Sequence, residues 1–198
     1  MKVISGLYKG RNIEGFFIDG TRPTMDRVKE SLFATIQEYI KESTVLDLFS
    51  GSGNLAIEAL SEGAKYAYLV DHNKKAVDII NRNIKNIGIA NCKVLNMDYK
   101  QSIKYLNANN IKFDLIFLDP PYKTDYIEES IKLIDKYNIL SEEGLIICES
   151  DNINKIVYSN KYELKKEKKY SDKYVVILKK IWYHIHSRWL SWIIRDLL

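Results

Sequence analysis

The sequence predicts an α/β fold whose mostly parallel, seven-stranded sheet ends in a C-terminal antiparallel hairpin. From Thr44 onward, short β-branched runs alternate with helical patterns, which is typical of βαβ units around a parallel sheet. After Ser150, two strand-like runs flank a polar break, as in a hairpin that closes a sheet edge. The 198-residue chain is 46% hydrophobic, which is enough for one substantial core.

The parallel part, which we assign to residues 44–180 together with the hairpin, is expected to contain five strands with helices between them. Short apolar runs predict the strands Val45–Phe49, Tyr66–Val70, Cys92–Asn96, Phe113–Leu118 and Leu145–Glu149. Helical patterns separate them at Asn54–Ser61, Lys74–Ile87, Lys100–Asn107 and Asp125–Tyr137. Gly63 and Gly88 stand where helix C-caps are expected. The hairpin is expected from Tyr162–Lys168 and Tyr174–Leu178.

Residues 1–43 predict a small N-terminal extension that consists of a β-hairpin and a helix. A strand-like start at Lys2–Ser5 leads into a glycine-punctuated hairpin that reaches Gly20, and a helix follows on which Val28, Leu32, Ile36 and Ile40 recur every four residues. Residues 181–198 differ in composition and hold all three tryptophans. We interpret them as an extension unrelated to the main domain, although an amphipathic helix that docks on the protein or on lipid is an alternative.

Composition narrows the class of protein. The formal charge of +4 permits a polyanionic partner, and the eight lysines between Lys161 and Lys180 can be either solvated surface or ligand contacts. Cys92 and Cys148 lie in predicted strands without a C-x-x-C pair or a histidine cluster, so we expect reduced thiols and no metal site. Because the chain shows neither an apolar leader nor a membrane-length segment, we expect a cytoplasmic protein with no membrane partner.

The run Asp119-Pro120-Pro121-Tyr122 directly follows the fourth predicted strand. The first proline disfavours helical backbone at Asp119, and neither proline has an N–H to donate, so the chain here is stiff and extended with free carbonyls. A carboxylate, a fixed carbonyl and a flat ring together suit a planar ring that carries an amine. A Pro-Pro turn of purely structural meaning is the competing interpretation.

Acidic residues also follow the first three strands of the predicted sheet. Asp47, Asp71 and Asp98 lie at or near strand ends, where open α/β sheets bind ligands. The turn Gly51-x-Gly53 lets the backbone approach a ligand closely, and with Ala56 it also satisfies the fingerprint of NAD enzymes. A carboxylate at position 47 repels a pyrophosphate and favours a cationic group. For Asp47 or Asp98 alone, a helix N-cap explains the residue equally well.

These motifs resemble those of the Rossmann-like class I S-adenosylmethionine-dependent methyltransferases, which include enzymes that methylate exocyclic or amide nitrogens. The N-terminal part narrows the resemblance. Val3–Gly6, Tyr8–Arg11, Thr21–Phe33 and Leu46–Gly53 are similar to the RsmD-type 16S rRNA guanine-N2 methyltransferases, in the same order along most of residues 1–180. Ser50 and Asn54 depart from the expected alanine-like residues, and the tail after Lys180 has no counterpart.

The resemblance implies a role for each candidate residue. S-adenosylmethionine would be held by Asp47, Phe49, Gly51 and Gly53 at its amino-acid end, by Asp71 at the ribose, and by His72 and Asp98 at the adenine. A flipped guanine would lie on Tyr122, with its amine held by Asp119 and the Pro120 carbonyl. Lys9, Arg11, Arg22 and Arg27 would face 16S rRNA or the assembling small subunit, and a structural role is the alternative for Arg22 and Arg27, which flank a helix start. A monomer is expected.

Three other functions compete with this interpretation. The same chemistry could act on a DNA adenine or cytosine amine or on a protein glutamine amide, but the Thr21–Phe33 block favours rRNA. A non-catalytic RNA-binding assembly factor would not need the intact Asp119–Tyr122 motif. An NAD oxidoreductase would need a Tyr-x-x-x-Lys pair in a suitable helix, and none is present.

Overall fold

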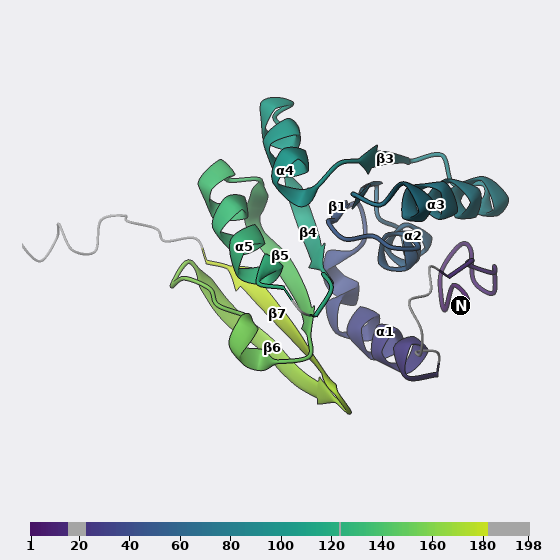
Figure 1. Cartoon of the computed structure of the whole chain (residues 1–198). Coiled ribbons are helices and arrows are strands. Elements are labelled where there is room, and N and C mark those ends of the chain that lie inside the picture. The colour runs from purple at the N-terminus through teal and green to yellow at the C-terminus, as the bar shows by residue number, and fades with distance from the viewer. Residues whose placement is uncertain (16–22, 123, 182–198) are drawn as a thin grey trace, which may run out of the picture.

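The computed structural model describes residues 1–15, 23–122 and 124–181, with only the backbone described for 23–25. Seven strands form one sheet in the order β3-β2-β1-β4-β5-β7-β6 (Figure 1). Strands β1 to β5 are mutually parallel, whereas β7 is antiparallel to both β5 and β6. The strands are β1 (Thr44–Asp47), β2 (Tyr66–Asp71), β3 (Cys92–Asn96), β4 (Phe113–Leu118), β5 (Leu140–Ser150), β6 (Tyr162–Tyr170) and β7 (Lys173–Lys180).

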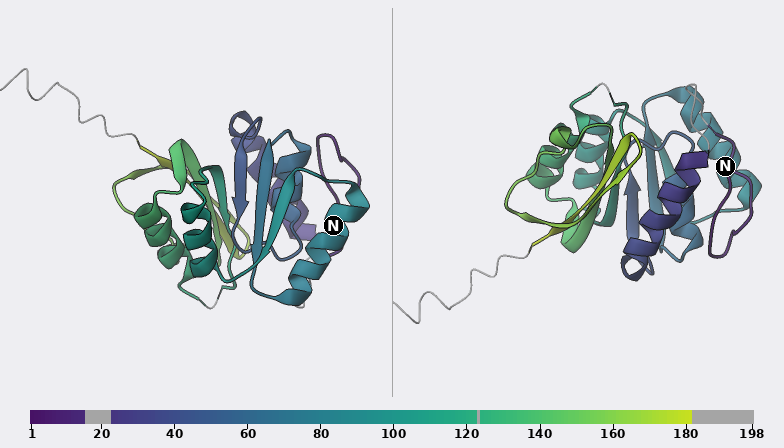
Figure 2. Two further views of the ribbon diagram at one scale, coloured as in Figure 1. Left: turned by 90° about the horizontal axis from the view of Figure 1, so that it is seen from above. Right: turned by 90° about the horizontal axis from the view of Figure 1, so that it is seen from below.

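Helices cover both faces of the sheet (Figure 2). The helices are α1 (Pro23–Ile36), α2 (Asn54–Ser61), α3 (Lys74–Ile87), α4 (Tyr99–Ala108) and α5 (Tyr126–Tyr137), with 3-10 turns at Gln37–Tyr39 and Ile153–Lys155. One core cluster joins α1, α2 and α3 to one face, and a second joins α4 and α5 to the other. Because both faces are buried, the central strands are mostly apolar and do not alternate with polar residues.

The predicted seven-stranded, mostly parallel sheet with its closing hairpin is confirmed. Strands Cys92–Asn96 and Phe113–Leu118 and helices Asn54–Ser61 and Lys74–Ile87 have the predicted bounds. Strand β5 begins five residues earlier than predicted, because Leu140 pairs with Phe113 across an irregularity in the ladder. The helix predicted to reach Ile40 ends at Ile36 and continues as the 3-10 turn.

The N-terminal segment forms a short loop with one antiparallel bridge, between Lys2 and Asn12. The rest of the predicted hairpin, residues 16–20, lies outside the described residues. The loop lies directly on α2: the Leu7 amide donates to the Ser61 carbonyl at 2.7 Å. At Gly6, with φ of 76°, an added Cβ would lie 1.9 Å from the Ser61 oxygen, so only glycine permits this approach.

Candidate functional site

The carboxyl ends of the neighbouring strands β2, β1 and β4 bring three of the predicted acids to one edge of the sheet. Asp71 and Asp47 are the last residues of β2 and β1, and Asp119 directly follows β4. The charges interact, because the Asp71 carboxylate raises the pKa of Asp47, and Asp47 in turn raises the pKa of Asp119. The arrangement is therefore a single acidic crevice edge, of the kind where parallel sheets bind ligands.

Asp47 is the most buried of these acids, with 1% of its surface exposed. Burial is the main cause that raises its pKa to about 7, and a weak hydrogen bond from the Ala56 amide, at 3.4 Å, opposes the shift. Ala56 lies in the first turn of α2, so Asp47 faces the positive end of that helix. A nearby cation would hold this carboxylate in its ionised form.

The turn between β1 and α2 is fixed by hydrogen bonds from both sides. The Gly51 amide donates to Asp71 Oδ2 at 2.9 Å. The Ser50 hydroxyl donates to the Asp47 carbonyl at 2.7 Å and accepts from the Val70 amide at 2.9 Å. Gly51 and Gly53 have φ of 56° and 81°, in the left-handed region that favours glycine. Asp71 thus shapes the glycine turn, a role that was not predicted from the sequence.

Two further predicted cofactor residues, His72 and Asp98, lie just after the strands β2 and β3. Asp98 follows β3 and caps α4, since its Oδ1 accepts from the amides of Lys100 and Gln101 at 2.8 and 3.0 Å. The N-cap explanation that the sequence left open therefore holds for Asp98. The His72 side chain is 73% exposed, and its Nδ1 lies 3.7 Å from Asp71 Oδ1.

Phe49 belongs to a cluster of three aromatic rings at this end of the sheet. Its ring centre lies 5.5 Å from that of Tyr99 and 6.1 Å from that of Tyr126, nearly parallel to the latter. The Tyr99 hydroxyl donates a hydrogen bond to the Glu129 carboxylate. Burial and this hydrogen bond raise the pKa of Tyr99 to about 12. Tyr99 and Tyr126 were not identified from the sequence, because each is the first residue of a helix and reaches Phe49 only in the tertiary structure.

The Asp119–Tyr122 motif packs against an ion pair from the strands beyond β4. The Tyr122 hydroxyl donates to Glu149 Oε1 at 3.0 Å, and the Lys173 ammonium contacts the same oxygen. The Lys173 nitrogen also lies 5.3 Å from the centre of the Tyr122 ring. Lys155 donates to the Tyr122 carbonyl. Tyr122 is thus contacted at its hydroxyl, at one face of its ring and at its backbone carbonyl.

The charges of Glu149 and Lys173 affect the pKa of Asp119. Burial, reinforced by the Glu149 charge, raises the pKa of Asp119 well above its ordinary value, and Lys173 opposes the shift. Burial lowers the pKa of Lys173, but Glu149, Tyr122 and Asp119 together raise it above its ordinary value. Neither Glu149 nor Lys173 was identified from the sequence. The available signal was that Glu149 is an acid near the carboxyl end of a fifth parallel strand.

The predicted RNA-facing residues occupy two places. Lys9 and Arg11 are exposed on the N-terminal loop, and Arg27 is exposed on α1, whereas Arg22 lies outside the described residues.

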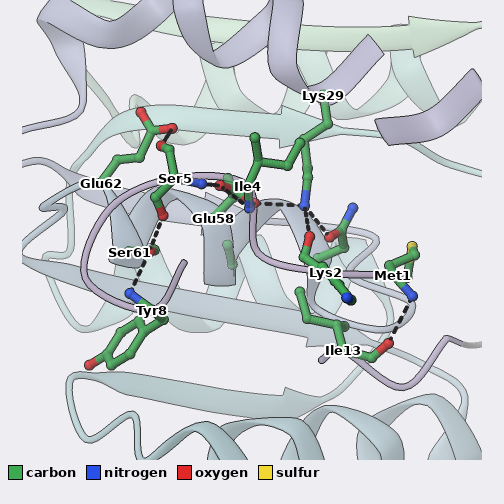
Figure 3. Close-up of polar contacts among 12 residues, drawn as sticks. Met1, Lys2, Ile4, Ser5, Tyr8, Ile13, Lys29, Glu58, Ser61 and Glu62 are labelled. Atoms are coloured by element: carbon green, nitrogen blue, oxygen red, sulfur yellow. Dashed lines mark hydrogen bonds and ion pairs between the residues drawn. The ribbon is translucent and has the colours of Figure 1, made fainter. Parts of the chain in front are cut away.

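A buried ion pair fastens the N-terminal loop to the helices α1 and α2 (Figure 3). Lys29 and Glu58, 2% and 0% exposed, lie 2.6 Å apart. Glu58 accepts from the amides of Ile4 and Ser5, and Lys29 donates to the Lys2 carbonyl. Lys29 is therefore structural.

The described part of the chain contains no helix that is long and apolar enough to cross a membrane. Within the same residues, no cluster of three or more His, Cys, Asp or Glu side chains could hold a metal ion. Cys148 is buried and Cys92 half-buried, both as free thiols.

Comparison with known proteins identifies the family. The profile of the family described as Conserved hypothetical protein 95 matches residues 1–179. The putative rRNA methyltransferase YlbH of Bacillus subtilis is 40% identical over 152 residues, which cover 76% of this chain and 83% of that protein. Ribosomal RNA small subunit methyltransferase D of Haemophilus influenzae is 34% identical over 172 residues, covering 85% and 88%. The chain belongs to the RsmD-type methyltransferase family.

A solved structure agrees with this RsmD-type assignment. The putative methyltransferase yhhF from Escherichia coli superposes with a TM-score of 0.82 and 28% identity, covering 91% of this chain and 98% of that one. The predicted Rossmann-like class I methyltransferase fold is therefore confirmed. The profile match ends at residue 179, just before the tryptophan-rich tail.

Proposed function

We propose that this protein transfers a methyl group from S-adenosylmethionine to the exocyclic N2 amine of a guanine in small-subunit rRNA. The observation that carries the proposal is the placement of Asp119 and Tyr122 beside the acidic crevice edge of Asp47 and Asp71. The names of the relatives support the rRNA substrate, since those proteins are described as small-subunit rRNA methyltransferases. We further propose that the protein acts as a cytoplasmic monomer.

The crevice has the donor set that S-adenosylmethionine requires. Asp47 offers a carboxylate to the cationic amino-acid end, next to Phe49, Gly51 and Gly53. A Cβ at Gly51 would meet no atom within 4 Å, so the backbone of the turn faces open space. Asp71 serves the ribose hydroxyls, and His72 and Asp98 flank the adenine. When bound, S-adenosylmethionine supplies a methyl group already activated by its sulfonium, which leaves positioning as the main task of the protein.

The target guanine is expected to leave its stack, at a cost of roughly a few kcal/mol, and to lie against the Tyr122 ring. Asp119 and the Pro120 carbonyl accept the two amine hydrogens, which orients the nitrogen lone pair towards the methyl group. Transfer would form a bond between the nitrogen and the methyl carbon while the bond from that carbon to sulfur breaks and S-adenosylhomocysteine leaves. Positive charge would develop on the nitrogen during this step. The Asp119 carboxylate stabilises this charge and takes the released proton, and its raised pKa makes it a stronger base than an ordinary aspartate.

Glu149 and Lys173 act as positioning residues in this proposal. Glu149 fixes the Tyr122 hydroxyl, and Lys173 both neutralises Glu149 and lies near the ring. A ring held at a fixed orientation gives the guanine a preformed stacking surface, so little conformational entropy is lost when the base arrives.

Lys9, Arg11, Arg22 and Arg27 are proposed to contact rRNA phosphates. Their charges are suited to backbone contacts, which position an RNA without reading its sequence. Replacing Lys9 and Arg11 by glutamate should weaken RNA binding and flatten its salt dependence. An unaltered salt slope would show that these two residues do not contact the RNA.

The decisive experiment is to incubate the protein with labelled S-adenosylmethionine and unmodified small-subunit rRNA, both as a naked transcript and within partly assembled subunits. Mass spectrometry of nuclease fragments then locates the label. We expect a single N2-methylguanine. In parallel reactions with DNA or protein in place of rRNA, label on a DNA amine or a protein glutamine would assign the chain to those alternative substrates instead. Cofactor binding without any transfer would indicate a non-catalytic assembly factor.

A further inference from the structure

Two lysines on the outermost strand of the sheet face helix α1. The Lys166 ammonium donates to the Thr35 hydroxyl at 3.0 Å, and the Lys168 ammonium donates to the Ser31 hydroxyl at 3.1 Å. Among the described residues, strand β6 pairs with β7 alone, so within this part of the chain its other edge carries no strand partner. Figure 2 shows α1 lying beside this hairpin. The hydroxyls hold both ammonium groups in place at the seam between β6 and α1.

The charges of these two lysines are not neutralised within the described residues. Their hydrogen-bond partners are neutral hydroxyls, and neither lysine has a carboxylate within ion-pair distance. Neighbouring lysines differ: Lys165 lies 3.6 Å from Glu38, and Lys180 lies 2.9 Å from Glu142. Lys166 and Lys168 therefore keep positive charge that Lys165 and Lys180 lose to acids, which favours an anionic partner.

Helix α1 extends the seam with a third cation. Arg27, Ser31 and Thr35 are spaced at four-residue intervals, which places them on one face of the helix about 6 Å apart. Arg27 is exposed and forms no ion pair in the described part of the chain. On β6, Lys166 and Lys168 are two residues apart, a rise of about 7 Å. Such spacings suit successive phosphates of a nucleic-acid strand.

The seam leads towards the proposed base pocket. Strand β6 runs parallel to β5, because β7 is antiparallel to both, so its C-terminal end reaches the carboxyl edge of the sheet. There Tyr170 donates to Ser31 and pairs with Lys173, the residue that lies near the Tyr122 ring. An RNA strand on the seam would therefore approach Tyr122 from the side of the closing hairpin.

We propose that Arg27, Lys166 and Lys168 form a phosphate-binding track that holds the RNA strand flanking the methylated base. The inference rests on the proposed rRNA substrate and adds a contact surface that the N-terminal loop does not supply. Lysines on an edge strand also discourage pairing with other sheets. A lysine at any position along the edge strand could serve that role. The hydroxyl partners on α1, in contrast, hold both ammonium groups on the same side of β6.

The test compares RNA binding by Lys166→Ala/Lys168→Ala with a control of equal charge change, Lys85→Ala/Lys104→Ala. The control lysines are exposed on α3 and α4 and form no ion pair among the described residues. The probe is unmodified small-subunit rRNA transcript, with S-adenosylhomocysteine present so that no methyl transfer occurs. Affinity is measured over a series of salt concentrations.

The slope of log K against log salt is negative. We expect its magnitude to decrease by about 1.4 to 1.8 for the seam variant and to stay unchanged for the control. Lys166→Arg/Lys168→Arg should retain the wild-type slope, and S-adenosylhomocysteine binding should be equal in all variants. A seam variant with the slope of the control would overturn the inference, even if methylation proceeds. Loss of slope in a protein that methylates no RNA would instead refute the proposed function and leave the track in place.

Discussion

The Lys173 ammonium lies 5.3 Å from the centre of the Tyr122 ring, although Lys173 belongs to the hairpin and Tyr122 to the loop after β4. The two residues also share a partner, since Glu149 accepts a hydrogen bond from the Tyr122 hydroxyl and forms an ion pair with Lys173. With side chains 9% and 18% exposed, Lys173 and Glu149 form a largely buried pair. Removing one member leaves the other charge without compensation.

Lys173→Met should therefore destabilise the protein, by roughly 3 kcal/mol, because it strands the Glu149 carboxylate in a poorly solvated place. The double variant Glu149→Gln/Lys173→Met should recover part of this loss, because no unpaired charge remains. Denaturant titration of the two single variants and the double variant measures the coupling. Additive effects would mean that the two groups do not interact energetically.

Tyr122→Ala should weaken the productive binding of RNA by roughly 1–3 kcal/mol, the usual contribution of a base stacked on an aromatic ring. Tyr122→Phe is the matched control, because it keeps the ring and loses only the hydrogen bond to Glu149. Steady-state methylation kinetics with the rRNA substrate distinguish the two. If the alanine variant is as active as wild type, Tyr122 is not the stacking surface.

Asp119→Ala should abolish methyl transfer while S-adenosylhomocysteine still binds. The carboxylate is proposed to hold the amine and to receive its proton, neither of which alanine can do. Calorimetric titration with S-adenosylhomocysteine confirms that the crevice is intact in the variant. Methylation at a rate near that of wild type would rule out the role assigned to Asp119.

The burial of Asp47 should make stability depend on pH. Its pKa is raised from 3.8 to about 7 in the folded protein, so between these values the folded state binds more protons than the unfolded state. Stability from this group is therefore highest below the unfolded pKa and falls as pH rises towards 7, by up to about 4 kcal/mol.

Asp47→Asn should flatten that dependence, which denaturant unfolding across the acidic range will reveal. Bound S-adenosylmethionine should act in the opposite direction, because a cation beside Asp47 favours the ionised form. Its affinity is accordingly expected to rise with pH up to about 7 in the wild-type protein. The same pH profile in the asparagine variant would assign the titration to another group.

Two ion pairs with the same 2.6 Å separation should differ sharply in their contribution to stability. Lys29→Met breaks the buried pair with Glu58 and should cost about 3–5 kcal/mol, since Glu58 is left unpaired in the interior. Lys132→Met on α5 breaks an exposed pair with Glu128 and should cost less than about 1 kcal/mol. Equal losses in thermal unfolding would contradict the structural role given to Lys29.

Local sequence patterns were sufficient to predict most of the fold. The period of the apolar residues distinguishes strands from helices, and the parallel order follows from their alternation, so Asp47, Asp71 and Asp119 could be assigned to one edge in advance. The predicted bounds of a strand were wrong where pairing with a neighbouring strand determined them. Strand β5 reaches back to Leu140 because β4 offers a partner there, and no local pattern reports such a partner.

The surroundings of the candidate residues were decided only by tertiary structure. Lys173 is one of eight lysines in a charged run, and nothing local distinguishes it from those that remain in solvent. It reaches Tyr122 because β7 inserts between β5 and β6, which sets Lys173 beside Glu149. Lys29 likewise becomes buried only when α1 and α2 meet over the N-terminal loop. Sequence thus determined which chemical groups the chain carries and in what order along the strands, whereas long-range packing decided which charges lose water and must find a partner.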